Sequence, residues 1–241
     1  MDAVALILGA GDGLGAALVR KCAAQGLRTV AVRRDRKALE RLASSLAESG
    51  IAIDIRAVDA TDNASVAGLV AEIEADLGPI AIAVYNVTAF MSRNQITDLS
   101  AEELRTAWEQ SALGGFLMAR EVAKAMLPRG EGTLIFNGST ASTRGSANYG
   151  ALAGGRAALR ALTQSMAREW GPKGLHVAHV VIDGAIDSPA LRRRAAERGL
   201  ELPEDGLLNP DHIAEQVWQL HRQTRTAWTH ELTLRPWTEK W

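Results

Sequence analysis

Short apolar runs alternate along the chain with segments in which apolar residues recur every three or four positions. Runs of strand length that are apolar throughout are typical of strands buried on both faces of a sheet. A helical period between them, as in Leu14, Leu18 and Cys22, is typical of helices with one buried face. The predicted strands are residues 3–8, 28–33, 51–58, 80–85, 133–137, 175–182 and a short last one at 231–234.

Helices are expected between these strands, the longest over roughly residues 101–126 and another that includes residues 157–169. Strands and helices that alternate in this way form a parallel sheet through right-handed crossovers. The expected fold class is therefore α/β, a doubly wound, mostly parallel seven-stranded sheet with helices on both faces, in three layers. No repeat or linker divides the sequence, so residues 1–241 are expected to form one domain. Residues 187–209 carry many charges and little periodicity, which suits either a substrate lid or a mobile surface insertion.

Composition narrows the class of protein. Hydrophobic residues make up 47% of the chain, enough for a sizeable core, and the formal net charge is −1. A balance so close to neutral gives no general attraction to nucleic acid or to an anionic membrane, so neither is an expected partner. The single cysteine, Cys22, lies on the apolar side of a predicted helix and is expected to be buried and unreactive. With no leader-like start and no apolar stretch approaching ~18 residues, we expect a soluble cytoplasmic protein.

A glycine-rich loop, Gly-Ala-Gly-Asp-Gly-Leu-Gly at residues 9–15, follows the first strand and opens the first helix. Gly9, Gly13 and Gly15 allow a tight turn and a close backbone approach, and Asp12 and Leu14 lie between them. The start of the helix adds free N–H groups and a positive dipole potential. The loop therefore predicts a pyrophosphate site, the alternative being a tight turn that holds no ligand.

The spacing of these glycines matches the short-chain dehydrogenase/reductase family, and the resemblance covers nearly the whole chain. Asp59 and Ala60, in Asp-Ala-Thr-Asp after the third strand, resemble the family's adenine-contacting element. Asn86, followed by Val87, resembles the second asparagine of its Asn-Asn-Ala-Gly motif, although the flanking residues differ. Ser139 resembles its catalytic serine at the end of the fifth strand. The resemblance implies a Rossmann-type fold, a nicotinamide cofactor and a homodimer or homotetramer.

Two further positions resemble residues that contact the nicotinamide in the family. Gly184 follows Asp183 where the family generally has Pro-Gly after the sixth strand, so proline is replaced by a charged residue near the nicotinamide end. Ser188 resembles a later threonine that bonds the carboxamide. Beside it, Asp187 is interpreted either as a charge that faces the substrate or as a helix cap.

The end of the second strand bears on the choice of cofactor. An acidic residue there would accept hydrogen bonds from the ribose 2′-hydroxyl and favour NAD(H). This chain has Arg33 and Arg34, whose guanidinium groups can hold a 2′-phosphate. NADP(H) is therefore the preferred cofactor. NAD(H) stays possible, because the arginines could merely cover the helix entry while Asp35 reaches the ribose.

The resemblance implies hydride transfer between the nicotinamide and a small carbonyl or alcohol substrate. In the family a tyrosine follows the serine by about thirteen positions and a lysine comes four later; here these positions hold Leu152 and Arg156. Leucine transfers no proton, which typically costs ~10²–10⁴-fold in rate, whereas Arg156 can still bind the nicotinamide ribose. The position of the family's active-site asparagine holds Ser111, interpreted as a helix serine bonded to its own backbone.

Tyr149 is the candidate surrogate acid. It would share a helix face with Leu152 and Arg156 if the helix were continuous from residue 149, although Gly150 weakens that expectation. The competing interpretation is a pocket-wall or core tyrosine. Two functions stay open: an oxidoreductase with an atypical proton donor, and a protein that binds NADP(H) in a regulatory or structural role without turnover.

The five histidines show no grouping with acids or cysteine that would bind a metal, so no metal is expected. His176 and His179 lie along a predicted strand and are interpreted as hydrogen-bonded core or edge residues.

Overall fold

A computed structural model describes residues 3–203 and 205–239, which form one seven-stranded sheet in the order β3-β2-β1-β4-β5-β6-β7. Each strand pairs with its neighbour in parallel. The doubly wound parallel fold expected from the sequence is confirmed. The strands are β1 (Val4–Leu8), β2 (Arg28–Arg33), β3 (Asp54–Ala57), β4 (Ile80–Tyr85), β5 (Gly132–Asn137), β6 (Leu175–Ile182) and β7 (Glu231–Leu234).

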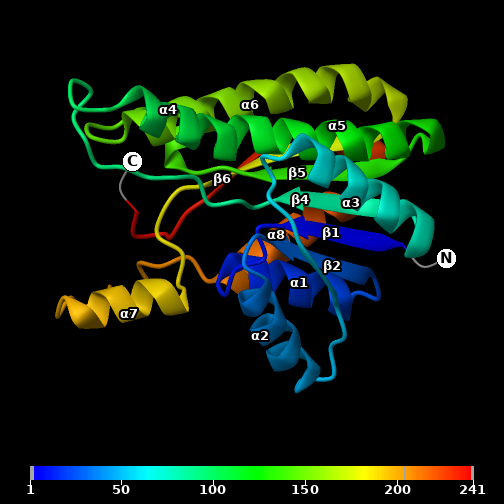
Figure 1. Cartoon of the computed structure of the whole chain (residues 1–241), viewed down its shortest axis with the longest axis horizontal. Coiled ribbons are helices and arrows are strands. Elements are labelled where there is room, and N and C mark those ends of the chain that lie inside the picture. Colours follow the sequence, from blue (N-terminus) through cyan, green and yellow to red (C-terminus); the bar gives the residue numbers. More distant parts are fainter. Residues whose placement is uncertain (1–2, 204, 240–241) are drawn as a thin grey trace.

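Helices cover both faces of the sheet in three layers (Figure 1). The layer with α3, α5 and α6 packs on one face, and α1, α2 and α8 pack on the other. The two cores separate by strand alternation, since Leu6 belongs to the first and its neighbour Ile7 to the second. The helices are α1 (Leu14–Ala24), α2 (Arg36–Ala47), α3 (Asn63–Asp76), α4 (Ala101–Trp108), α5 (Gly114–Met126), α6 (Gly150–Trp170), α7 (Pro189–Glu197) and α8 (Pro210–Arg222).

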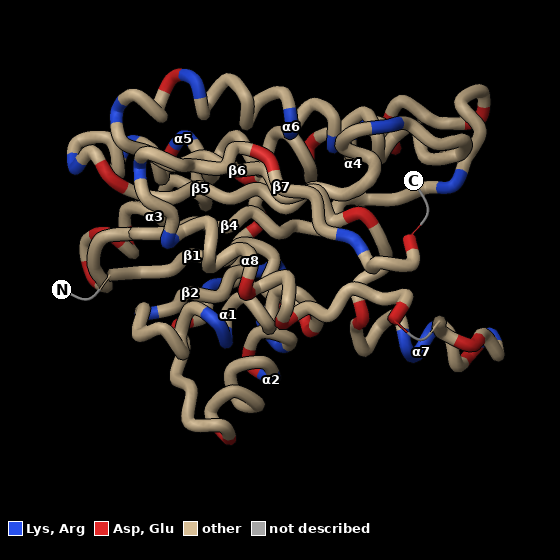
Figure 2. Tube along the Cα trace, turned by 180° about the vertical axis from the view of Figure 1, so that it is seen from behind, with Lys and Arg blue, Asp and Glu red and all other residues tan. Residues whose placement is uncertain are grey.

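Charged residues lie mainly on the outer helices and at strand ends, while the middle of the sheet is almost free of them (Figure 2). Cys22 is buried on α1, as expected, and burial raises the pKa of its thiol to about 12, so the thiol stays protonated and unreactive. Within residues 3–203 and 205–239, none of the helices is both long and apolar enough to span a membrane.

Three elements differ from the sequence-based prediction. The third strand is shorter than residues 51–58, because it lies at the edge of the sheet and Ile51 and Ile53 pack against the core without pairing. The expected helix over 101–126 contains a π-helical segment, Glu109–Leu113, between α4 and α5. The aperiodic stretch 187–209 includes α7, which extends away from the sheet (Figure 1), and Ile186 forms a parallel bridge with Leu208.

Candidate active site

The glycine loop brings the ends of β1 and β4 into close contact. Gly9 has a φ of +94°, and a Cβ atom at this position would lie 2.4 Å from the carbonyl oxygen of Asn86. A Cβ on Gly15 would lie 2.5 Å from the carbonyl oxygen of Gly9. Gly13 precedes α1, whose first turn has no side-chain cap. The loop thus combines a close backbone approach with an uncapped helix start, which fits a pyrophosphate.

A cavity of about 250 Å³ opens beside this loop, at the carboxyl ends of the first four strands. It has the position expected for the adenosine half of a dinucleotide in an open α/β sheet. It brings together seven of the predicted cofactor residues: Gly9, Arg33, Arg34, Asp59, Ala60, Asn86 and Val87. Gln110 also lines it, and sequence reasoning missed this residue because it reaches the cavity from the π-helical segment.

Two ion pairs hold arginines at the rim of this cavity. Nη1 of Arg33 lies 3.4 Å from Asp12, and Nη1 of Arg34 lies 3.7 Å from Asp59. Asp35, the alternative ribose ligand, lines the same cavity and also caps α2 by accepting a hydrogen bond from the N–H of Ala38. Both cations and this carboxylate therefore border the cavity, and the carboxylate has the helix start as a partner.

An asparagine network joins the loop to the centre of the sheet. Nδ2 of Asn86 donates to the carbonyl oxygen of Gly9 at 2.9 Å, and Nδ2 of Asn137 donates to Oδ1 of Asn86 at 3.0 Å. Arg156 continues the network from α6, because Nη1 donates to the carbonyl of Asn137 and Nη2 to that of Val87, both at 3.0 Å. These bonds fix the carboxyl ends of β4 and β5 to each other and to α6.

Arg156 is buried, with 8% of its surface exposed. Burial disfavours the charged form and lowers the pKa of its guanidinium. The structure thus gives Arg156 a strand-tying contact that the sequence did not suggest, in addition to its place one helical turn after Leu152 on α6.

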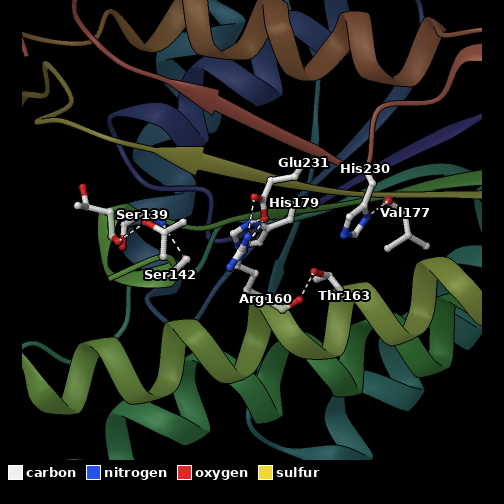
Figure 3. Close-up of polar contacts among 10 residues, drawn as sticks. Ser139, Ser142, Arg160, Thr163, Val177, His179, His230 and Glu231 are labelled. Carbon is white, nitrogen blue, oxygen red and sulfur yellow. Dashed lines mark hydrogen bonds and ion pairs between the residues drawn. The ribbon is translucent and has the colours of Figure 1, made fainter. Parts of the chain in front are cut away.

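Ser139 lies two residues after the end of β5 and is the cap residue of the turn η3 (Thr140–Ser142). Its main-chain N–H donates to Oγ of Ser142 at 3.1 Å, a contact drawn in Figure 3. Its own Oγ is buried and finds no hydrogen-bond partner within the described part of the chain. A buried hydroxyl without a partner is costly, so it is a candidate to bind a ligand oxygen.

Behind Ser139 lies a group of polar side chains between α6 and the last two strands (Figure 3). Nη2 of Arg160 donates to Glu231 at 2.8 Å, and Nδ1 of His179 lies 3.6 Å from the same carboxylate. Burial lowers the pKa of His179 to about 4, so its ring is neutral at neutral pH. A Cβ on Gly138 would lie 2.4 Å from Nε2 of His179, so this ring supports the serine loop from beneath.

His176 and His179 were both expected to be hydrogen-bonded, and the part of the chain that the structure describes confirms this for His176 alone. Nε2 of His176 bonds to the carbonyl of Thr229 at 2.8 Å, and its ring stacks on Trp228. The ring nitrogens of His179, in contrast, have no hydrogen-bond partner among the residues that the structure describes.

Tyr149 lies outside α6. It is the N-cap residue, with φ −120° and ψ 23°, so the continuous helix from residue 149 is wrong by one position. Its half-buried ring has the guanidinium of Arg93 5.6 Å from the centroid. The side chain therefore does not follow the helical face of Leu152 and Arg156.

Ser111 also differs from its prediction. It lies in the π-helical segment and is fully buried, and its Oγ has no hydrogen-bond partner in the described ranges. The expected bond to its own backbone is therefore wrong. The extra residue of a π-helical turn displaces the carbonyls that a helix serine normally uses.

At the start of segment 187–209, Ser188 caps α7 by accepting a hydrogen bond from the N–H of Leu191 at 3.2 Å. Its Cβ lies 3.0 Å from the position of a Cβ on Gly13, so the start of segment 187–209 touches the glycine loop. Asp187 does not cap α7, because Ser188 is the cap residue, and its carboxylate forms a bidentate ion pair with Arg192. Among residues 3–203 and 205–239, no group of three His, Cys, Asp or Glu residues could hold a metal ion.

Comparison with known proteins agrees with this arrangement. Residues 3–199 match the family described as short chain dehydrogenase. The chain is 31% identical to 2,3-dihydro-2,3-dihydroxybenzoate dehydrogenase of Bacillus subtilis (strain 168), covering 89% of this chain and 76% of that protein. It is 26% identical to the 3-oxoacyl-[acyl-carrier-protein] reductase FabG of Escherichia coli (strain K12), covering 78% and 75%.

Solved structures show the same likeness. A short-chain dehydrogenase from Rhodopseudomonas palustris superposes with a TM-score of 0.83 at 33% identity, covering 98% of this chain and all of that one. A metagenomic short-chain oxidoreductase in complex with NADP also has a TM-score of 0.83, at 22% identity and with 99% and 98% covered. With its glycine loop, serine and strand order in place, the chain belongs to the short-chain dehydrogenase family.

Proposed function

We propose that the protein is an NADP(H)-dependent oxidoreductase that transfers hydride between the nicotinamide and a small carbonyl or alcohol substrate. The observation that carries this proposal is the buried, unpartnered Oγ of Ser139 at the carboxyl end of β5, among the described residues. A hydroxyl held there can donate a hydrogen bond to a substrate oxygen as negative charge develops on it. When bound, the cofactor supplies or accepts the hydride.

The remaining candidate residues would bind the cofactor and orient the substrate. The close approach at Gly9 and the uncapped start of α1 at Gly13 support a site for the pyrophosphate, with Asp12, Leu14 and Gly15 in the same loop. From the resemblance to the family, we assign Gly184 and Ser188 to the nicotinamide half of the proposed site. We propose that segment 187–209 acts as the substrate lid, since Ser188 contacts Gly13 at its start.

The preference for NADP(H) over NAD(H) rests on Arg33 and Arg34 at the cavity rim and on the use of Asp35 as a helix cap. Replacing both arginines by alanine is expected to weaken NADPH binding by about 10- to 100-fold, from the loss of charged hydrogen bonds, and to leave NADH binding nearly unchanged. Fluorescence titration measures both affinities. Arg36→Ala is the matched control, because Arg36 pairs with Glu40 on the exposed face of α2. Equal losses for both cofactors would contradict the preference.

We propose Tyr149 as the proton donor. Of the two tyrosines in the chain, Tyr85 is buried and its hydroxyl donates to the carbonyl of Gln110 at 2.6 Å, which leaves Tyr149. Tyr149→Phe is expected to lower turnover by ~10²–10⁴-fold while NADPH binding is retained. Unaltered turnover in this variant, measured with a panel of carbonyl substrates, would remove Tyr149 from the mechanism.

A second function is favoured by Leu152 and Arg156. Leu152 offers no proton, and both terminal nitrogens of Arg156 bond to main-chain carbonyls. These features suit a protein that binds NADP(H) in a regulatory or structural role. Titration with NADPH followed by its oxidation with the carbonyl panel separates the two functions. Binding without turnover would support the second, and a gain of turnover in Leu152→Tyr with Arg156→Lys would locate the cause in these two positions. Absence of cofactor binding would contradict both.

We also propose a homodimer or homotetramer, supported by the exposed apolar side chains of Leu104 and Trp108 on α4. The mass in solution, measured by light scattering, tests this state.

A further inference from the structure

Asp183 connects three strand ends at the substrate side of the sheet. It directly follows β6, and its Oδ1 accepts a hydrogen bond from Oγ1 of Thr140 at 2.5 Å. Its Oδ2 forms an ion pair with Arg235, which directly follows β7. Thr140 is the residue next to Ser139, so the carboxylate joins the serine loop after β5 to the tail after β7.

The ion pair lies in a largely buried place. The side chain of Asp183 is 10% exposed and that of Arg235 is 15% exposed. Both carboxylate oxygens have partners, so the charge that replaces proline here is held within the protein and does not face a substrate. The bond from Thr140, with the charge of Arg235, keeps the pKa of Asp183 below its ordinary value.

The backbone around Asp183 is equally constrained. Its N–H donates to the carbonyl of Leu234 at 2.8 Å, which extends the pairing of β6 and β7 by one residue. A Cβ on the next residue, Gly184, would lie 2.8 Å from Cδ of Pro236. The carboxylate therefore projects from a fixed backbone, and Thr140 is tied to a rigid point.

We propose that Asp183 is a positioning residue, which through Thr140 and Arg235 holds the Ser139 hydroxyl where it meets the substrate oxygen. This inference rests on the proposed oxidoreductase function. Within the short turn at η3, the N–H of Ser142 donates to the carbonyl of Ser139 at 2.8 Å and the N–H of Ser139 donates to Oγ of Ser142 at 3.1 Å. The strap of Thr140, Asp183 and Arg235 adds an anchor from outside the turn, at the ends of β6 and β7.

Kinetics of Thr140 variants test the strap without breaking its ion pair. In Thr140→Val, kcat for carbonyl reduction is expected to fall by about 10- to 100-fold, because a displacement of 1 Å near the reacting atoms has this effect. The KM for the carbonyl and the affinity for NADPH are expected to stay near wild type, since the serine bond strengthens mainly in the transition state. Thr140→Ser keeps the hydroxyl and is expected to restore kcat. Unchanged kcat in Thr140→Val, or no rescue by Thr140→Ser, would overturn the proposal.

Hydrogen exchange of the full chain gives a readout that does not depend on turnover. Asp183→Asn keeps the size of the side chain and removes its charge, and it is expected to speed exchange of the Ser142 and Thr143 amides. Asp211→Asn is the matched control, because it removes a surface partner of Arg20 far from this loop and leaves those amides unchanged. Unaltered exchange in Asp183→Asn would overturn the strap. A wild-type protein that reduces no carbonyl would contradict the proposed function, while exchange would still decide whether the strap holds the loop.

Discussion

Gly9 shows how a single residue sets the shape of the glycine loop. Gly9→Ala would combine a left-handed φ of +94° with a Cβ only 2.4 Å from the carbonyl oxygen of Asn86. The strain alone costs about 1–3 kcal/mol, and the contact forces β1 and β4 apart. The variant is expected to lose stability by more than this range and to lose NADPH binding, as measured by urea unfolding and fluorescence titration.

Gly26→Ala separates the two effects of that substitution. Gly26 has a similar φ of +84°, but none of the described residues would lie within 4 Å of its added Cβ. Its loss of stability is expected to stay within the ~1–3 kcal/mol of backbone strain, with NADPH affinity unchanged. If Gly9→Ala loses no more stability than Gly26→Ala, the close approach to Asn86 is not the reason that a glycine is required at position 9.

Ser111 leads to the opposite expectation. Its buried Oγ has no partner within the described ranges, and a buried hydroxyl without a partner costs about 1–3 kcal/mol. Ser111→Ala is therefore expected to raise the free energy of unfolding in urea by about 1 kcal/mol. Ser165→Ala is the comparison, since that exposed hydroxyl contacts the carbonyl of Ala161 and is expected to matter little. A loss of stability in Ser111→Ala would show that the hydroxyl is bonded in solution.

The site residues that could be predicted from the sequence are those whose role depends on residues close to them along the chain. The glycine loop is of this kind, because its spacing follows from the turn between one strand and one helix, and Arg33 and Arg34 follow because they end a strand. Partners across the fold left no such signal. The carboxylate of Asp183 meets Thr140 forty-three positions earlier, and His179 meets Gly138 only because β5 and β6 pair side by side.

At the scale of elements, the long interval between β4 and β5 was expected to be one helix, and hydrophobic period alone supports that prediction. The observed π-helical segment adds one residue to a turn, which changes the period too little to be read from the sequence. Its consequence is local: Gln110 reaches the cavity beside the glycine loop, and Ser111 turns toward α6.

The packing of α6 against α4 gives a test at this scale. A Cβ on Gly155 would lie 2.6 Å from the carbonyl oxygen of Ala107, so Gly155→Ala forces the two helices apart. Such overpacking is expected to cost about 1–3 kcal/mol of stability in urea unfolding. The neighbouring Gly154 is the matched control, because its added Cβ would meet, among the described residues, only Leu104 at an ordinary contact distance of 3.6 Å. Gly154→Ala is expected to gain up to ~1 kcal/mol from helix propensity. Equal effects of the two substitutions would contradict close packing at Gly155.

For the whole molecule, two cores on opposite faces of one sheet leave few places for charge inside. Buried polar side chains lie on several elements, among them Arg156 on α6 and His176 and His179 on β6. Burial lowers the pKa of the histidines among them, and of His221 on α8. Burial lowers the pKa of both His179 and His221 to about 4, against a value near 6.5 for histidine in an unfolded chain. For His221 the nearby charge of Arg222 acts in the same direction.

This difference in pKa sets the direction of the pH dependence. Between about pH 4 and 6.5 the unfolded chain binds more protons than the folded one, so stability rises with pH across this window and is lost as pH falls through it. Each such histidine contributes up to about 1.4 kcal/mol per pH unit. Asp183 and Glu231, whose pKa values are lowered by their partners, add a loss only at lower pH, near the ordinary carboxyl range.

Urea unfolding at pH 7, 6 and 5 measures this slope. His221→Gln is expected to make this slope shallower, because it removes one ring whose pKa is lowered by burial. His212→Gln, on the exposed face of α8, is expected to leave the slope as in the wild type. A wild-type free energy of unfolding that stays constant from pH 7 to 5 would mean that these rings take up protons in the folded state as readily as in the unfolded one. The group behind Ser139 would then carry a charge at mildly acidic pH, next to the loop on which the proposed chemistry depends.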